Sequence, residues 1–152
     1  MDIEQIAIIF LIVAVTVASS IGIYYATTGI LPGASIISVQ DAPLATTTGL
    51  DKDQYKFMFF YAPWCPYSKA AESAWASLKQ DYKNSPQTYQ NANIIFEDID
   101  GDDQKGKMAL YGVTKYPTFK FQVNDKVYEM LGKPTTANFQ TFIKTVLDKK
   151  SS

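Results

Sequence analysis

The chain has 152 residues, 14 lysines, 15 acidic side chains and a formal net charge of −1. It contains no histidine and no arginine, and its lysines are scattered, which excludes histidine-based catalysis and argues against a nucleic-acid partner. Its single cysteine, Cys65, excludes an internal disulfide and a multi-thiolate zinc site, so we expect neither a cofactor nor a bound metal.

The first segment is uncharged and strongly apolar. No charged side chain occurs from Gln5 to Gln40, and Ile6–Tyr25 consists mainly of aliphatic residues. Twenty helical residues rise about 30 Å, the thickness of the bilayer interior. We therefore predict a single-pass transmembrane anchor over residues 1–28. Its orientation stays open, because Lys52 lies too far from the anchor to set topology.

A cleaved signal peptide is the main alternative to an anchor. Signal peptides carry a basic leader before a shorter apolar core. Here Asp2 and Glu4 precede the apolar run, and no basic residue does. A buried helix of a soluble protein is the third interpretation, which the length and uniform apolarity disfavour. We favour an uncleaved anchor in the lipid bilayer, with the soluble domain on one side.

A linker is predicted over residues 29–49, which are rich in Gly, Pro, Thr and Ser. Ile36–Val39 is compatible with a short strand, and the remainder is typical of a tether. A folded domain is predicted over residues 50–152.

Alternating strand and helix patterns fill this domain. Lys56–Tyr61 and Asn93–Ile99 are apolar runs of the kind found in strands covered on both faces. The remaining expected elements are a helix opened by Pro66, a helix over Gln104–Tyr111 closed by Gly112, hairpin strands Thr118–Val123 and Lys126–Leu131, and a final helix over Thr135–Asp148.

Two segments resemble those of a known family. Phe60–Cys65 reads Phe-Tyr-Ala-Pro-Trp-Cys, which resembles the active-site strand and turn of protein disulfide isomerase domains. Tyr111–Phe119 is similar to the segment around that family's cis-proline. The two segments occur in the family's order and spacing. The resemblance implies an α/β thioredoxin fold, a central mixed sheet flanked by helices.

The candidate site centres on Cys65, at the start of the helix that Pro66 opens. Backbone N–H groups and the dipole of a helix N-terminus favour a thiolate there. The resemblance implies that Pro117 is cis and lies against Cys65, and that Trp64 shields the sulfur. It further implies a client-binding surface, for which the expected residues are Trp64, Pro66, Tyr67, Tyr116 and Pro117.

The site differs from the family in the residues that resolve a mixed disulfide and so release the bound client. Ser68 replaces the resolving cysteine, which leaves a monothiol Cys-x-x-Ser motif. Phe59 occupies the position of the family's buried carboxylate, and the family's arginine is missing. These features serve the resolving step, so their joint loss predicts an absence of turnover.

Two functions remain open at this stage. The sequence leans towards a docking or structural component of a membrane-associated assembly, such as a virion with an internal membrane, rather than an enzyme. The alternative is monothiol disulfide exchange or client trapping, in which Cys65 forms a mixed disulfide with a protein partner. Asp100, Asp102 and Asp103 are expected to form a solvated turn, because the full ligand spacing of a calcium loop is missing.

Overall fold

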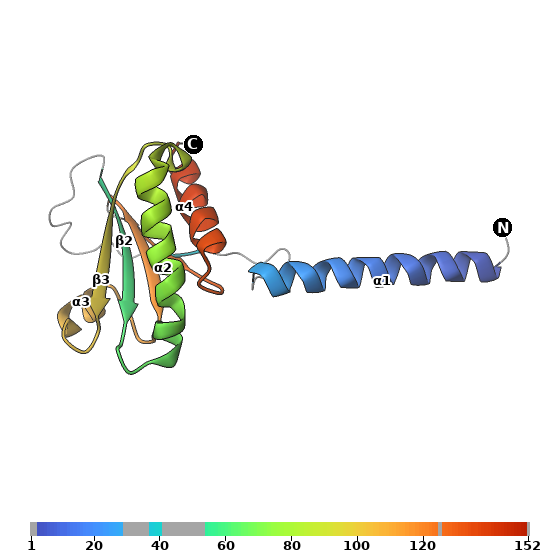
Figure 1. Cartoon of the computed structure of the whole chain (residues 1–152), viewed down its shortest axis with the longest axis horizontal. Helices are drawn as coiled ribbons and strands as arrows, with labels where there is room; N and C mark the ends of the chain where they lie inside the picture. The colour runs from blue at the N-terminus through green and yellow to red at the C-terminus, as the bar shows by residue number, and fades with distance from the viewer. Residues whose placement is uncertain (1–2, 29–36, 41–53, 125, 152) are drawn as a thin grey trace. The chain divides into compact units, whose positions relative to one another are not determined.

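The computed structural model describes residues 3–28, 37–40, 54–124 and 126–151. The chain divides into two compact units, Met1–Ala34 and Ser35–Ser152. Figure 1 shows the long helix of the first unit and the sheet and helices of the second. The predicted tether, apart from residues 37–40, lies outside the described residues.

The first unit is a single helix, α1, over Ile3–Thr28. Residues Gln5–Tyr24 are long and apolar enough to cross a membrane, a test that a signal sequence also passes. The hydroxyl groups of Thr16, Ser19 and Ser20 bond within the helix and donate to backbone carbonyls one turn earlier. Such internal pairing satisfies polar groups where lipid offers no partner.

The second unit is built on a five-stranded mixed sheet in the order β1-β5-β4-β2-β3. β2 pairs in parallel with β3 and antiparallel with β4, and β5 pairs antiparallel with β4 and β1. The strands are β1 Ile37–Gln40, β2 Gln54–Tyr61, β3 Asn93–Asp100, β4 Thr118–Val123 and β5 Lys126–Met130. β1 falls within the segment predicted as a linker and adds an edge strand to the sheet.

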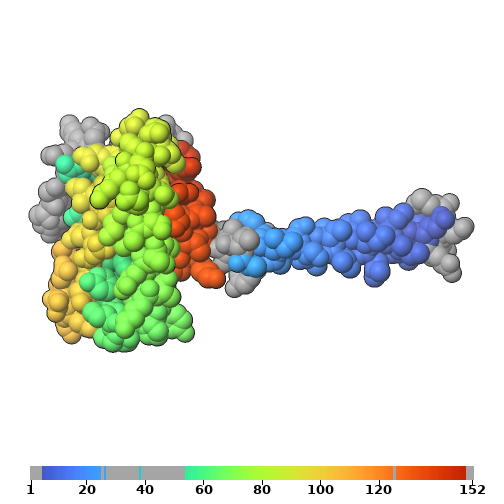
Figure 2. All heavy atoms as spheres, in the orientation of Figure 1, coloured from blue at the N-terminus to red at the C-terminus, as the bar shows by residue number. Residues whose placement is uncertain are grey.

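Two long helices cover one face of this sheet, and a short one lies on the other. α2 (Pro66–Asn84) and α4 (Thr136–Ser151) pack side by side, and Figure 2 shows their side chains closing over the sheet. α3 (Lys105–Leu110) supplies Met108 to the apolar cluster of the opposite face. A 3-10 turn, η1 (Pro86–Tyr89), follows α2. The fold is the predicted thioredoxin fold.

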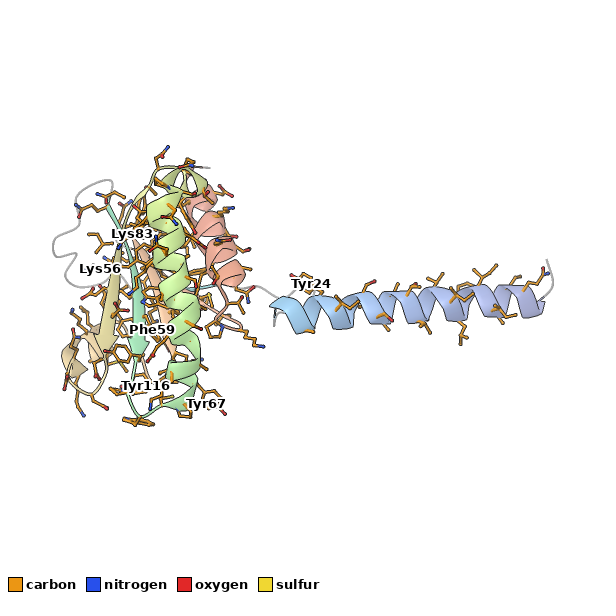
Figure 3. The ribbon with its side chains drawn as sticks, viewed as in Figure 1. Tyr24, Lys56, Phe59, Tyr67, Lys83 and Tyr116 are labelled. Atoms are coloured by element: carbon orange, nitrogen blue, oxygen red, sulfur yellow. The ribbon has the colours of Figure 1, made fainter. Side chains whose placement is uncertain are left out.

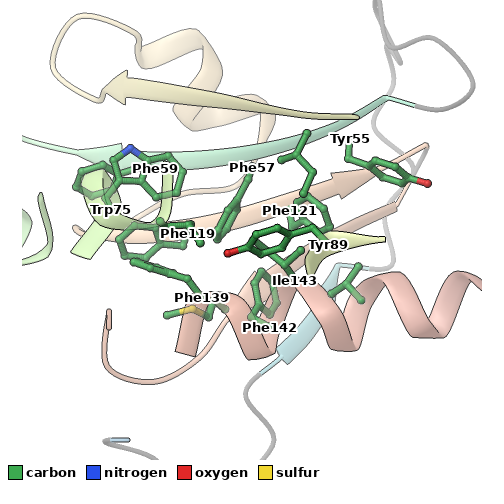
Figure 4. Packing of buried hydrophobic residues seen from close by; sticks show 14 of the residues in the cluster. Tyr55, Phe57, Phe59, Trp75, Tyr89, Phe119, Phe121, Phe139, Phe142 and Ile143 are labelled. Atoms are coloured by element: carbon green, nitrogen blue, oxygen red, sulfur yellow. The ribbon is translucent and has the colours of Figure 1, made fainter. Parts of the chain in front are cut away.

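Aromatic rings dominate the core between the sheet and the two long helices. Phe57 of β2 is fully buried and lies at its centre (Figure 4). Its ring centroid is 5.1 Å from that of Trp75 in α2, 5.6 Å from Phe121 in β4 and 5.7 Å from Phe142 in α4. Phe57 therefore joins the sheet to both helices.

Two details differ from the sequence-based expectations. β3 is not covered on both faces, because it is the last strand of the sheet, and Ile95 is 40% exposed. The η1 turn was not anticipated from the sequence. By contrast, Gly112 follows α3 with a positive φ of 60°, as expected of a helix-terminating glycine.

Replacing Phe57 with alanine removes the ring that joins these elements. We expect Phe57→Ala to lower the free energy of unfolding by about 3–5 kcal/mol, measured by urea denaturation of the full chain in an uncharged detergent. Ile95→Ala on the edge strand should cost less than about 1 kcal/mol. Equal losses from the two substitutions would contradict this description of the core.

Candidate active site

Cys65 ends a tight turn that follows β2 and caps the N-terminus of α2. Its backbone is extended, with φ −79° and ψ 116°, and Pro66 occupies the first helical turn. The Cys65 N–H donates to the Ala62 carbonyl at 3.0 Å, which closes the turn. The residue is only 5% exposed. The sulfur therefore lies at the helix end where backbone N–H groups lack helical partners.

Hydrogen bonds from the start of α2 lower the pKa of the Cys65 thiol. The largest contribution is the backbone N–H of Ser68, and the Ser68 hydroxyl and the Tyr67 N–H add to it. Burial acts in the opposite direction but is outweighed. Donors that bond the charged form of a group stabilise it, so the thiolate is favoured here. The sequence predicted this environment from the helix N-terminus alone.

The Tyr116–Pro117 peptide bond is cis, as the resemblance implies. The Cys65 Sγ–H donates to the carbonyl of Tyr116 at 3.9 Å, a long contact that joins the two predicted segments. The structure thus brings the cysteine and the proline loop together. The predicted client-binding role of these residues remains a prediction.

Ser68 lies beneath Cys65 and is fully buried. The Ala62 N–H donates to its hydroxyl at 3.3 Å, so Ser68 also supports the turn. Since Cys65 is the only cysteine of the sequence, a disulfide formed at its sulfur cannot be resolved within the chain. Ser68 therefore adds a donor that lowers the pKa of the thiol and supplies no second sulfur.

Phe59 belongs to the aromatic core. It is 2% exposed, and its ring stacks on that of Phe119 at a centroid distance of 4.8 Å and an interplanar angle of 8°. A second contact, at 5.6 Å, is made with Trp75. An ionised carboxylate at this position would be buried among rings, so the surroundings suit an apolar side chain.

Of the predicted client-binding residues, Trp64, Pro66 and Tyr67 are exposed, and Tyr116 and Pro117 are half-buried. Trp64 is 67% exposed and Tyr67 is 73% exposed. Trp64 packs edge-on against Tyr116, with ring centroids 6.1 Å apart. Figure 3 shows Tyr67 and Tyr116 towards the end of the domain at which α2 begins. Large exposed rings of this kind are enriched where proteins bind other proteins.

The turn after β3 contributes residues that the sequence analysis did not assign to the site. Trp64 Nε1 donates to Asp102 Oδ2 at 2.8 Å, and the Gly101 N–H donates to the Tyr61 carbonyl at 2.9 Å. Asp102 and Asp103 are exposed, as expected of a solvated turn, and Asp102 in addition bonds Trp64. Parallel pairing of β2 with β3 sets Tyr61 opposite Asp100, so the two following turns must meet.

Gly101 is required by the close approach of Tyr116. A Cβ atom at residue 101 would lie 1.9 Å from Tyr116 Oη. We expect Gly101→Ala to lower the free energy of unfolding by about 1–3 kcal/mol through this overlap. In a Tyr116→Ala background the same change should cost less than about 0.5 kcal/mol. An equal cost in both backgrounds would show that the ring is not the constraint.

Comparisons with known proteins agree with this geometry. The thioredoxin family model matches residues 46–145. The chain is 28% identical to mouse protein disulfide-isomerase A2 over 94 residues, which cover 62% of this chain and 16% of the relative. It is 37% identical to protein disulfide-isomerase 1 of Dictyostelium discoideum over 75 residues, which cover 47% of this chain and 19% of that relative. The chain thus spans less than a fifth of the length of these two relatives.

Solved structures show the same fold. Human ERp44 superposes with a TM-score of 0.52 and 21% identity, over 62% of this chain and 28% of that one. The Trx4 domain of ERdj5 superposes with a TM-score of 0.51 and 16% identity, over 64% of this chain and 82% of that one. The sheet order, the helix arrangement, the cis-proline and the family match lead to one conclusion. The chain belongs to the thioredoxin family.

Proposed function

We propose that the protein is a membrane-anchored monothiol exchange protein that captures disulfide-bonded partner proteins at Cys65. One observation supports this proposal above the others. The donors that lower the pKa of the thiol are intact, although Ser68 supplies no second sulfur. Attack on a disulfide, the first half of an exchange reaction, needs only this one activated sulfur.

The proposed reaction is a single thiol–disulfide exchange. The Cys65 thiolate attacks one sulfur of a partner's disulfide, a Cys65–partner disulfide forms, and the partner's sulfur–sulfur bond breaks. The second partner sulfur leaves as a thiolate and takes a proton from water. Because no thiol of this chain can attack the mixed disulfide, it persists until an external thiol resolves it. Such chemistry suits retention of clients better than net oxidation.

The apolar helix α1 supports placing this reaction at a membrane. Its length and composition fit a span, and the acidic residues ahead of its apolar run are unlike a signal-peptide leader. An anchored trapping protein would hold its client near the bilayer.

The docking role that the sequence favoured remains a prediction, including its setting in a virion with an internal membrane. Among the described residues, no contact favours that role over exchange. The two functions differ in their need for the Cys65 sulfur, since a docking module works without it.

The pH dependence of Cys65 alkylation tests whether the nucleophile is activated. We expect an apparent pKa below the ordinary cysteine value of about 8.5, measured with iodoacetamide on the full chain in an uncharged detergent. Ser68→Ala removes one of the donors that lower the pKa, so its pKa should rise and labelling at pH 7 should slow. Ser73→Ala, on the exposed side of the same helix, is the matched control. An ordinary or raised pKa in the natural protein would refute the proposal.

Restoring the second thiol tests whether its loss prolongs the mixed disulfide. Ser68→Cys places a thiol where the family has its resolving cysteine. The introduced thiolate can attack the Cys65 sulfur of the mixed disulfide, release the client thiol and leave an internal disulfide. We expect the adduct with a small disulfide to persist in the natural protein. In the variant its lifetime should fall by at least about tenfold, followed by mass spectrometry. Equal lifetimes would contradict the proposed trapping.

A further inference from the structure

The turn Asp100–Asp103 forms a wall of the proposed exchange site. Its Asp102 carboxylate accepts the Trp64 Nε1–H at 2.8 Å. Its Gly101 lies so close to Tyr116 that no larger residue fits without displacing the ring. Trp64 precedes Cys65, and Tyr116 supplies the carbonyl that contacts its sulfur. The turn therefore contacts Trp64 and Tyr116, the two residues that flank the thiol.

This wall carries a concentration of negative charge. Burial raises the pKa of Tyr61, and the carboxylate of Asp100 raises it further, with smaller contributions from other acidic side chains. Burial also raises the pKa of Tyr116, and Asp102 and then Asp100 add to the shift. Both tyrosines lie beside the active-site turn. The negative field of the carboxylates thus extends over the rim of the site.

The lysines near the rim offset this charge only in part. Lys115 precedes Tyr116; its Nζ lies 3.9 Å from Glu129 Oε1, but Glu129 pairs more closely with Lys120, at 2.9 Å, so Lys115 counts as a cation near the rim. Lys69, in the first turns of α2, and Lys105, at the start of α3, are exposed cations at the margin of the site. The three carboxylates of the turn and that of Glu72 in α2 make four negative charges, against three cations.

We propose that this wall makes the site selective for disulfides flanked by positive charge, an inference that rests on the proposed exchange at Cys65. The partner would be a protein segment with lysine or arginine next to its disulfide-bonded cysteine. Its positive side chains would lie against the carboxylates while the Cys65 thiolate attacks the sulfur. Disulfides of anionic peptides such as glutathione would be disfavoured. Charge of one sign around a site raises the local concentration of oppositely charged substrates.

Three small disulfides of different charge test this selectivity. Cystamine carries two positive charges, 2-hydroxyethyl disulfide is neutral, and oxidised glutathione is negative. The rate of adduct formation on the full chain in an uncharged detergent is divided by the rate with 2-mercaptoethanol, which removes differences in intrinsic reactivity. We expect the corrected rate with cystamine to exceed that with oxidised glutathione by about tenfold at low ionic strength. In 1 M salt the preference should fall to about twofold.

Three variants that each remove one negative charge distinguish the effect of the wall from the effect of the net charge of the chain. Asp102→Asn removes the charge but keeps an oxygen that can accept the Trp64 N–H, and Asp103→Asn removes a charge not bonded to Trp64. Each should reduce the ratio of the corrected rate with cystamine to that with oxidised glutathione by about two- to threefold. Asp148→Asn in α4 is the matched control and should leave the preference unchanged.

The outcomes distinguish this inference from the proposed function. If all three disulfides react at equal corrected rates, or oxidised glutathione reacts fastest, the selectivity is refuted while exchange at Cys65 stands. A preference that Asp148→Asn reduces as much as Asp102→Asn also refutes the role of the wall. If none of the disulfides forms an adduct, the proposed function fails, and this inference fails with it.

Discussion

The pairing of β2 with both β3 and β4 determines where every part of the site lies. Tyr61, the last residue of β2, is opposite Asp100, and Phe60 is opposite Thr118. The turn that ends at Cys65 follows Tyr61, and the acidic turn begins at Asp100. The loop that contains the cis-proline precedes Thr118. Three segments far apart in the sequence therefore meet at one end of the sheet. Phe57, midway along β2, holds this strand to α2 and α4, so the core and the site depend on the same element.

The site that results has the groups needed for one half of a dithiol reaction. The start of α2 still directs backbone and side-chain donors at Cys65, which is the requirement for a nucleophilic thiolate. The groups that would resolve a mixed disulfide are absent. Ser68 has no sulfur, and the buried ring of Phe59 occupies the position at which the family has a carboxylate. Substitutions confined to the second half-reaction are what a protein that holds its clients would show.

Local patterns in the sequence were sufficient for most of the fold. Apolar runs, helical stripes, Pro66 and Gly112 placed the strands and helices within a few residues of their observed bounds. The family resemblance supplied the cis-proline at Pro117 and the thioredoxin fold. The order of the strands across the sheet could not be predicted from these local patterns. The apolar residues of β3 suggested a covered strand, whereas its place at the edge depends on pairing between distant segments. Asp102 was missed for the same reason, since its bond to Trp64 joins residues 38 positions apart.

The most direct test is the state of the Cys65 sulfur in the native membrane. Membranes would be quenched in acid, free thiols blocked, and the peptide containing Cys65 analysed by mass spectrometry without reduction. The proposed trapping function predicts a population of Cys65 disulfide-bonded to a partner protein, and loss of that partner from the Cys65→Ala variant. A sulfur that is always free, with partners that remain bound to the alanine variant, would contradict trapping and favour docking.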